Sequence, residues 1–149
     1  MRTPEELTEV FRERGLKVTP QRQFIFRVLY ANDLHPTAEG VHAAVVAELP
    51  TVSLRTVYQT LNDLADMGEI QAFDLGTGAA RFDPNTDAHY HAVCNGCGVV
   101  RDIDRGGSES GPRRRPLPGF TVQSTEIVYR GLCDECASHS TAKEKISHG

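Results

Sequence analysis

The sequence lacks the features of a membrane-spanning, secreted or disulfide-bonded protein. No run of apolar residues is long enough to cross a bilayer, and the polar N-terminal stretch has no secretory h-region. No cysteine lies outside two Cys-x-x-Cys pairs, whose spacing suits metal binding rather than disulfides. These absences predict a cytoplasmic protein.

A positive net charge is also absent, since the chain has 16 Lys and Arg, 20 Asp and Glu, and a net charge of −4. That total is not typical of a nucleic-acid-binding protein. Residues 10–30, however, contain five basic side chains and a single acidic one. Because local clusters decide phosphate contacts, this segment keeps DNA binding open. With 149 residues, the chain can form one large domain or two small ones. Two domains this small would each need extra stabilisation, for example from a bound metal ion.

The four cysteines form two pairs, Cys94 with Cys97 and Cys133 with Cys136. One Cys-x-x-Cys turn brings two sulfurs within reach of one ion, and two such turns complete the tetrahedral thiolate shell that zinc prefers. Two disulfides or scattered buried thiols are the alternative. Since no cysteine is left over, a structural zinc site is the better interpretation, and it would stabilise the second half of the chain.

The first half of the sequence predicts four helices. Gly15 ends the first, Thr19 caps the second with Pro20 at its first position, and Thr37 and Ser53 cap the third and fourth. Apolar residues at helical spacing define the faces expected to be buried: Leu7, Val10 and Phe11; Phe24, Ile25, Val28 and Leu29; Val41, Val45, Val46 and Leu49; Leu54, Val57, Tyr58, Leu61 and Leu64.

A hairpin is expected next, with strands at 70–73 and 79–82 around a glycine-rich turn. Four helices followed by a hairpin predict a winged helix-turn-helix, in which the last helix lies in the major groove. The exposed face of that helix presents side chains suited to bases or phosphates: Ser53, Arg55, Thr56, Tyr58 and Gln59. An all-helical cap with an ordinary solvated face is the alternative.

The second half predicts a small α/β unit around the cysteines, with strands at 99–103 and 120–129. The stretch 106–118 is too rich in glycine and proline for a helix, and its arginines 113–115 favour a solvated loop over an anion site. The fold class is therefore α+β. We expect a winged-helix domain at 1–82 and a hinge with metal ligands at 83–92. A dimerisation domain stabilised by zinc is expected at 93–137, and a flexible tail at 138–149.

A second set of candidate ligands lies before the cysteines. His89 and His91 alternate with one residue, so both imidazoles point to the same side of an extended strand. Asp83 and Asp102 can add oxygen ligands, and His35 can complete the set if two domains meet. Imidazole and carboxylate suit Fe(II), Mn(II) or other first-row divalent ions. Pairs of histidines are as often ordinary surface residues.

The chain resembles the ferric uptake regulator (Fur) family of bacterial metal-dependent repressors and, within it, the peroxide-sensing (PerR) branch. The matching stretches are Gly15–Arg22, His35–Glu39, Ser53–Leu61, Arg81–Asp83, His89–Cys97, Asp102 and Tyr129–Cys136. In this order they form a highly specific pattern.

The resemblance implies a homodimer that binds operator DNA. Its N-terminal winged helices would contact the DNA, and its C-terminal domains would hold the two subunits together. It implies structural zinc on Cys94, Cys97, Cys133 and Cys136, and regulatory Fe(II) or Mn(II) on His35, Asp83, His89, His91 and Asp102. By the same match Lys17 would reach the minor groove and Tyr58 the major groove, and we expect Arg22 to add a DNA contact. Family members usually have a helix where this chain has residues 106–118.

The peroxide branch is favoured because Asp83 and Asp102 stand where iron-sensing members usually carry glutamate. The resemblance implies that bound Fe(II) reacts with hydrogen peroxide and that His35 or His89 becomes 2-oxo-histidine, which releases the operator. Mn(II) would repress without reacting. The protein would be consumed rather than turned over, so it would not be an enzyme.

Two other functions stay open. An iron- or zinc-responsive repressor of the same fold would be released by chelation and be indifferent to peroxide. A metal-dependent enzyme that activates water or oxygen at the His/Asp site is the third candidate. No nucleophile motif or acid/base pair supports it, and the nearest unassigned carboxylates, Glu39 and Glu126, are expected at the solvated surface. His42, His139 and His148 have no assigned role.

Overall fold

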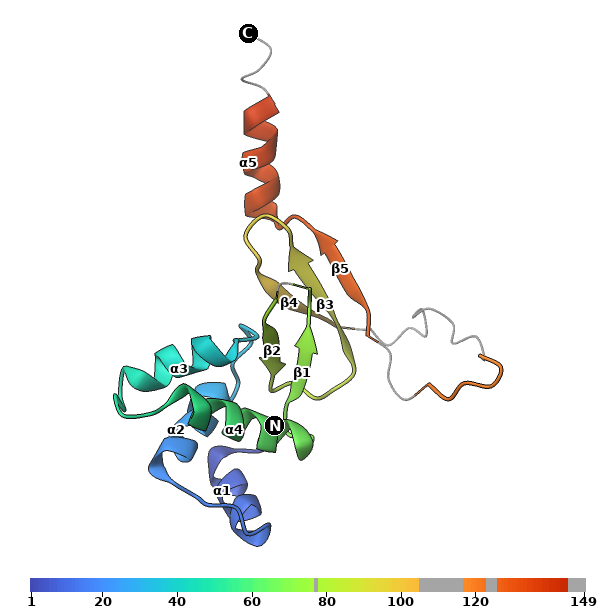
Figure 1. The fold of residues 1–149 in the computed structure, drawn as a ribbon. Helices are drawn as coiled ribbons and strands as arrows, with labels where there is room; N and C mark the ends of the chain where they lie inside the picture. The colour runs from blue at the N-terminus through green and yellow to red at the C-terminus, as the bar shows by residue number, and fades with distance from the viewer. Residues whose placement is uncertain (77, 105–116, 123–125, 145–149) are drawn as a thin grey trace. The chain divides into compact units, whose positions relative to one another are not determined.

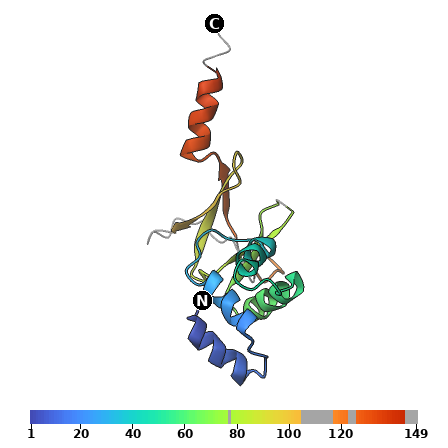
Figure 2. The same ribbon diagram turned by 90° about the vertical axis from the view of Figure 1, so that its left-hand side faces the viewer.

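The computed structural model describes residues 1–76, 78–104, 117–122 and 126–144. The chain divides into two compact units, Met1–Asp87 and Ala88–Gly149, shown as ribbons in Figures 1 and 2. Among the described residues, no helix is long and apolar enough to cross a membrane. Most of the segment 106–118, including its arginines, lies outside the described residues.

Four helices form the first part of unit 1, as predicted: α1 Pro4–Glu13, α2 Pro20–Leu29, α3 Ala38–Val46 and α4 Leu54–Asp66. The side chains of Thr19, Thr37 and Ser53 each accept a backbone N–H of the first turn of α2, α3 and α4, respectively. Gly15 follows α1 with φ of 69°, a left-handed conformation in which glycine is favoured and the helix ends.

The core of unit 1 is built from one face of each helix. Its largest buried side chains are Leu7, Phe11, Ile25, Phe26, Leu29, Val41, Val45, Val57, Leu61 and Leu64. Phe26, which the apolar spacing left out of the buried face, is also buried. Tyr58, expected both in the apolar stripe and on the exposed face of its helix, is 40% exposed and belongs to the exposed face. On α4 the buried face includes Thr60 instead, whose hydroxyl donates to the backbone oxygen of Thr56 at 2.8 Å.

The predicted hairpin follows the helices as β1 Gln71–Asp74 and β2 Ala80–Asp83, which pair antiparallel. Four helices and a hairpin in this order are those expected of a winged helix-turn-helix. The hairpin is tied back to the segment before α3, because Thr37 bridges Arg81 and the N–H of Phe82 donates to the backbone oxygen of Pro36 at 3.0 Å. These contacts hold the end of β2 beside His35.

The described residues of unit 2 form a three-stranded sheet and one helix: β3 His89–Cys94, β4 Val100–Asp104, β5 Val128–Gly131 and α5 Asp134–Glu144. The strand order is β4-β3-β5, with β4 antiparallel and β5 parallel to β3 (Figure 1). The strand expected over 120–129 begins later than expected. Among the described residues of that range, 120–122 and 126–127 lie outside any strand, and β5 begins at Val128, which lies opposite His91 of β3.

The predicted boundaries also need correction. Asp83 is the last residue of β2 and His89 the first of β3, so the connector is residues 84–88 rather than a hinge over 83–92. Residues 138–144, expected to be a flexible tail, are helical in α5, because residues 137–144 contain no glycine or proline that would end the helix. Residues 145–149 lie outside the described residues.

Candidate metal centres and nucleic-acid interface

The four cysteines gather at one end of unit 2, as the sequence predicts. Cys94 ends β3, Cys97 follows in the turn to β4, and Cys133 and Cys136 lie at the start of α5. All four sulfur atoms lie within 4.8 Å of one another, and the Sγ atoms of Cys97 and Cys133 are 3.8 Å apart. Two thiolates bound about 2.3 Å from one zinc ion in a tetrahedron lie about 3.8 Å apart, whereas a disulfide needs about 2.05 Å. The geometry fits a zinc site, and none of the four cysteines forms a disulfide.

Backbone groups stabilise the first thiolate of this cluster. The N–H groups of Cys133 and Gly96 each lie 3.3 Å from the Sγ atom of Cys94 and donate to it. Hydrogen bonds from the backbone of Cys133 and Cys97 lower the pKa of the Cys94 thiol to about 6. Hydrogen bonding with the sulfurs of Cys133 and Cys94 raises the pKa of Cys136 to about 12. Four thiolates so close together therefore require a cation between them.

Gly96 is a residue of this centre that the sequence reasoning missed. A Cβ atom at this position would lie 2.8 Å from the Sγ atom of Cys136 and 3.0 Å from its Cβ atom. Real Cβ atoms essentially never lie closer than 3.0 Å to another heavy atom, so a side chain at this position would require Cys136 to shift. Glycine at the third position of the first pair therefore lets Cys136 pack closely against the turn.

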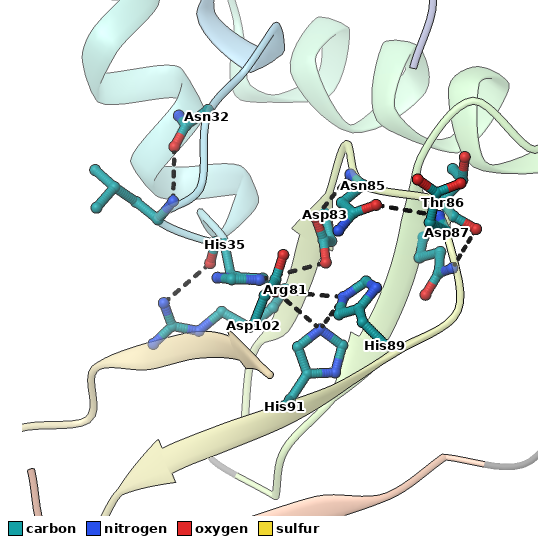
Figure 3. Close-up of polar contacts among 12 residues, drawn as sticks. Asn32, His35, Arg81, Asp83, Asn85, Thr86, Asp87, His89, His91 and Asp102 are labelled. Atoms are coloured by element: carbon teal, nitrogen blue, oxygen red, sulfur yellow. Dashed lines mark hydrogen bonds and ion pairs between the residues drawn. The ribbon is translucent and has the colours of Figure 1, made fainter. Parts of the chain in front are cut away.

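The sheet of unit 2 brings three further candidate ligands to one face. His89 and His91 share a face of β3, and Asp102 of β4 lies directly opposite His91 in the register. The Nε2 atoms of the histidines are 3.1 Å apart, and Oδ1 of Asp102 lies 3.3 Å from the first and 3.7 Å from the second (Figure 3). Atoms bound about 2.1–2.2 Å from one ion lie about 3.0–3.8 Å apart at bond angles of about 90–120°. The three side chains can therefore bind one ion together.

Unit 1 holds the other two candidate ligands as a pair. The Nε2 atom of His35 lies 3.3 Å from Oδ2 of Asp83, and the side chains are 0% and 1% exposed. His35 adopts φ of 49°, a left-handed conformation that is costly for a non-glycine residue. Arg81 supports it, because its Nη1 donates to the backbone oxygen of His35 at 3.1 Å (Figure 3).

The connector that follows Asp83 orients that carboxylate. The N–H of Asn85 donates to Oδ1 of Asp83 at 2.8 Å, and the N–H of Asp87 donates to the side-chain oxygen of Asn85 at 3.1 Å. The two oxygens of Asp83 thus have separate partners, one in the connector and one facing His35. Such outer contacts fix the direction in which a ligand points.

The exposed face of α4 carries the side chains predicted for DNA. Arg55, Tyr58 and Gln59 are exposed, while Ser53 accepts the N–H of Thr56 as the N-cap. A cavity of about 270 Å³ lies between this face and the start of α2, and it is lined by Lys17, Thr19, Gln21, Arg22, Arg55, Thr56 and Gln59. Basic and amide groups converge there, as a site for a nucleic-acid backbone requires.

Arg22, expected to contact DNA, instead makes several contacts within unit 1. Its guanidinium pairs with Asp63 at 3.0 Å, donates to the backbone oxygen of Lys17 at 3.1 Å, and lies 5.4 Å from the ring centre of Phe11. The Arg22 side chain is only 13% exposed. These contacts hold α2 against α4 and fix the segment that carries Lys17.

Glu39 lies on the surface, as expected, but it has a partner that the sequence did not indicate. The hydroxyl of Tyr58 donates to Oε1 of Glu39 at 2.9 Å and so connects the first turn of α3 with α4. The remaining unassigned groups have local positions. Nε2 of His42 lies 3.0 Å from the backbone oxygen of Val52, Nδ1 of His139 lies 2.6 Å from that of Glu135, Glu126 is exposed, and His148 lies outside the described residues.

Comparison with known proteins gives consistent matches along the chain. Residues 13–130 match the model of the ferric uptake regulator family. The peroxide-responsive repressor PerR of Staphylococcus aureus is 33% identical over 133 residues, which cover 89% of this chain and 90% of that protein.

Two solved structures illustrate the likeness in fold. The Helicobacter pylori ferric uptake regulator Fur superposes with a TM-score of 0.69 at 20% identity, with 89% of this chain and 90% of that chain covered. The ferric uptake regulator from Pseudomonas aeruginosa with manganese superposes with a TM-score of 0.63 at 28% identity, with 90% and 99% covered.

Proposed function

This chain belongs to the ferric uptake regulator family, and we propose that it is a homodimeric repressor that senses hydrogen peroxide. In this proposal, operator binding depends on a regulatory Fe(II) or Mn(II) ion and ends when peroxide oxidises a histidine ligand. The family consists of metal-responsive transcriptional regulators rather than enzymes, so the metal-dependent enzyme considered above is set aside.

The regulatory ion would be bound by both units at once. Unit 1 offers two ligands, His35 and Asp83, and unit 2 offers three, His89, His91 and Asp102. Neither set fills the shell of a five- or six-coordinate ion alone. The connector 84–88 would let both sets reach one ion, because six residue steps from Asp83 to His89 span at most about 22 Å. Three imidazoles and two carboxylates suit Fe(II) and Mn(II).

An ion bound in this way would control DNA binding through the arrangement of the two units. With the ion, the units would be held in one orientation; without it, only the connector would link them. A ligand shifts such an equilibrium by its difference in affinity for the two states. In a dimer, fixing both winged helices at the spacing of two half-sites would raise operator affinity.

Unit 2 has the surface expected of a dimerisation domain. Ile103, Tyr129 and Leu132 are large apolar residues that are 39–55% exposed. All three residues also line a cavity of about 300 Å³ beside the cysteines. Burying them against a second copy would remove apolar area from water. The zinc site would stiffen this unit rather than sense a signal.

The observation that carries the peroxide proposal is the pair of aspartates, Asp83 and Asp102, in a set with no glutamate and no thiolate. Iron bound there would supply the chemistry that activates peroxide. In the overall reaction, a ring carbon of His35 or His89 gains one peroxide oxygen and loses two electrons, and the second oxygen leaves as water. The histidine becomes 2-oxo-histidine, 16 Da heavier, and a ligand is lost. The peroxide-responsive relative at 33% identity supports this assignment.

The alternative is an iron- or zinc-responsive repressor of the same family, and one experiment separates the two. An operator is selected by the Mn(II)-loaded dimer from a random duplex library, and its binding is then measured with Fe(II) or Mn(II), before and after brief peroxide treatment. The proposal expects peroxide to abolish operator binding by the Fe(II)-loaded dimer and to leave binding by the Mn(II)-loaded dimer unchanged. In the Fe(II)-loaded dimer, the peptides that contain His35 or His89 should gain 16 Da. Full binding after peroxide without that gain would establish the alternative.

A further inference from the structure

The contact between Tyr58 and Glu39 determines what the tyrosine can offer to DNA. A phenol carries one proton, and here that proton is donated to Oε1 of Glu39 at 2.9 Å. While this bond is intact, the oxygen of Tyr58 can only accept hydrogen bonds. Glu39 is a carboxylate and is likewise an acceptor only. The two side chains therefore present acceptors together.

The pair lies on the face that α4 exposes. Tyr58 is 40% exposed and is three residues from Arg55, so the two side chains share one side of the helix. Glu39 is exposed in the first turn of α3. The backbone N–H of Glu39 itself, and after it the hydrogen bond from Tyr58, lowers the pKa of Glu39, so the carboxylate is ionised at neutral pH.

Acceptors discriminate among the groups that DNA presents. Phosphate oxygens, guanine O6 and N7 and thymine O4 are themselves acceptors, and a carboxylate beside phosphate is repelled. The donors in the major groove are the amino groups of adenine N6 and cytosine N4. A surface that can only accept is therefore unsuited to the backbone and suited to these two bases.

We propose that Glu39 and Tyr58 act as one acceptor pair that selects an adenine or cytosine amino group in the major groove. Glu39 is the positioning residue, because it fixes the direction of the hydroxyl proton, and Tyr58 makes the base contact beside Arg55. This inference rests on the proposed function, since it requires α4 to enter the groove. It adds a role for a carboxylate on a surface where basic residues are the usual expectation.

The test compares the base preference of the wild-type protein with that of its variants, all as Mn(II)-loaded dimers. Binding is measured by fluorescence anisotropy on the selected operator and on duplexes with each base pair changed singly. We expect the wild-type protein to require adenine or cytosine at one position of each half-site by roughly tenfold. Glu39→Ala frees the hydroxyl to donate and should reduce this preference to about twofold or less. Tyr58→Phe removes the acceptor and should do the same.

Glu48→Ala is the matched control. It removes an exposed carboxylate just after α3 that does not contact Tyr58, and it should keep the preference while changing affinity only slightly. In the double variant Glu39→Ala/Tyr58→Phe, the loss should not exceed that of either single change, since both act on one contact.

The two levels of the proposal fail in different ways. If the wild-type dimer selects no operator with Mn(II), the proposed function is wrong. If it selects one and Glu39→Ala keeps the full base preference, the acceptor pair is wrong while the repressor function stands. Equal loss of affinity for every duplex in Glu39→Ala, with the preference unchanged, would likewise overturn the pair and assign Glu39 to the stability of the helices. Circular dichroism of each variant confirms that it is folded.

Discussion

The Nε2 atom of His35 lies 3.3 Å from Oδ2 of Asp83, and almost nothing of either side chain is exposed. Two contacts hold this pair in place: Arg81 binds the backbone oxygen of His35, and Asn85 binds the second oxygen of Asp83. A pair ordered in this way loses little side-chain entropy when an ion arrives. Unit 1 therefore contributes an organised half of the proposed regulatory site.

Replacing His35 should abolish the regulatory response and spare the fold. Asparagine tolerates the left-handed conformation at this position, so His35→Asn removes the imidazole without adding backbone strain. We expect Mn(II) affinity, followed by electron paramagnetic resonance, to fall by at least about tenfold, while zinc content is unchanged. His42→Asn is the control, because His42 hydrogen-bonds with the backbone of Val52 and lies outside the candidate ligand set, so Mn(II) affinity should stay as it was.

Lengthening one carboxylate should separate repression from peroxide sensing. Asp102 is 29% exposed at its side chain, so Asp102→Glu can be accommodated without overpacking. We expect this variant to keep Mn(II)-dependent operator binding and to show a several-fold smaller 16 Da fraction after peroxide with Fe(II). Asp104→Glu, two residues along β4, should react like the wild-type protein. Equal oxidation in Asp102→Glu would mean that aspartate at this position does not determine peroxide sensing.

The helices and the hairpin could be predicted from the sequence, whereas some strand limits and the long-range contacts could not. Caps and apolar spacing located the four helices and the hairpin, because Thr19, Thr37 and Ser53 determine helix starts locally. The start of β3 and the start of β5 were not predictable, since strand limits depend on which strand lies alongside. Contacts between residues far apart in sequence, such as Tyr58 with Glu39, have no local signal.

Filling the space at Gly96 should weaken the zinc site. In Gly96→Ala the new methyl group would meet Cys136, so the shell must open or the start of α5 must shift. We expect zinc to be lost to a chelator at least about tenfold faster, with a lower melting temperature, because binding free energy of structural zinc is folding free energy. Gly131→Ala is the control, since nothing lies within 4 Å of a Cβ atom there. Equal zinc retention in both variants would contradict this role of Gly96.

Replacing Arg22 should lower the stability of the protein and leave its electrostatic attraction to DNA unchanged. Its pair with Asp63 is only partly solvated, so Arg22→Ala should cost about 2–3 kcal/mol, between the values for exposed and buried ion pairs. The salt dependence of operator binding should keep its slope, because no phosphate contact is lost. Arg27→Ala removes an exposed arginine of the same helix and should cost less than about 1 kcal/mol. A shallower salt slope in Arg22→Ala would instead establish a direct phosphate contact.

The Tyr58–Glu39 contact should persist only within a defined range of pH. Its hydrogen bond to Glu39 raises the pKa of Tyr58, so its contribution to stability is present below the tyrosine's ordinary pKa of about 10 and is lost as pH rises through the raised value. The pKa of Glu39 is lowered, so its contribution is present above about 4.3 and is lost as pH falls through the lowered value. Titration of the tyrosine ring carbons by NMR should show that Tyr58 of the wild-type protein ionises above its ordinary pKa. In Glu39→Ala its pKa should return toward the ordinary value, whereas Glu48→Ala should not change it; an unchanged titration in Glu39→Ala would mean that the bond does not form in solution.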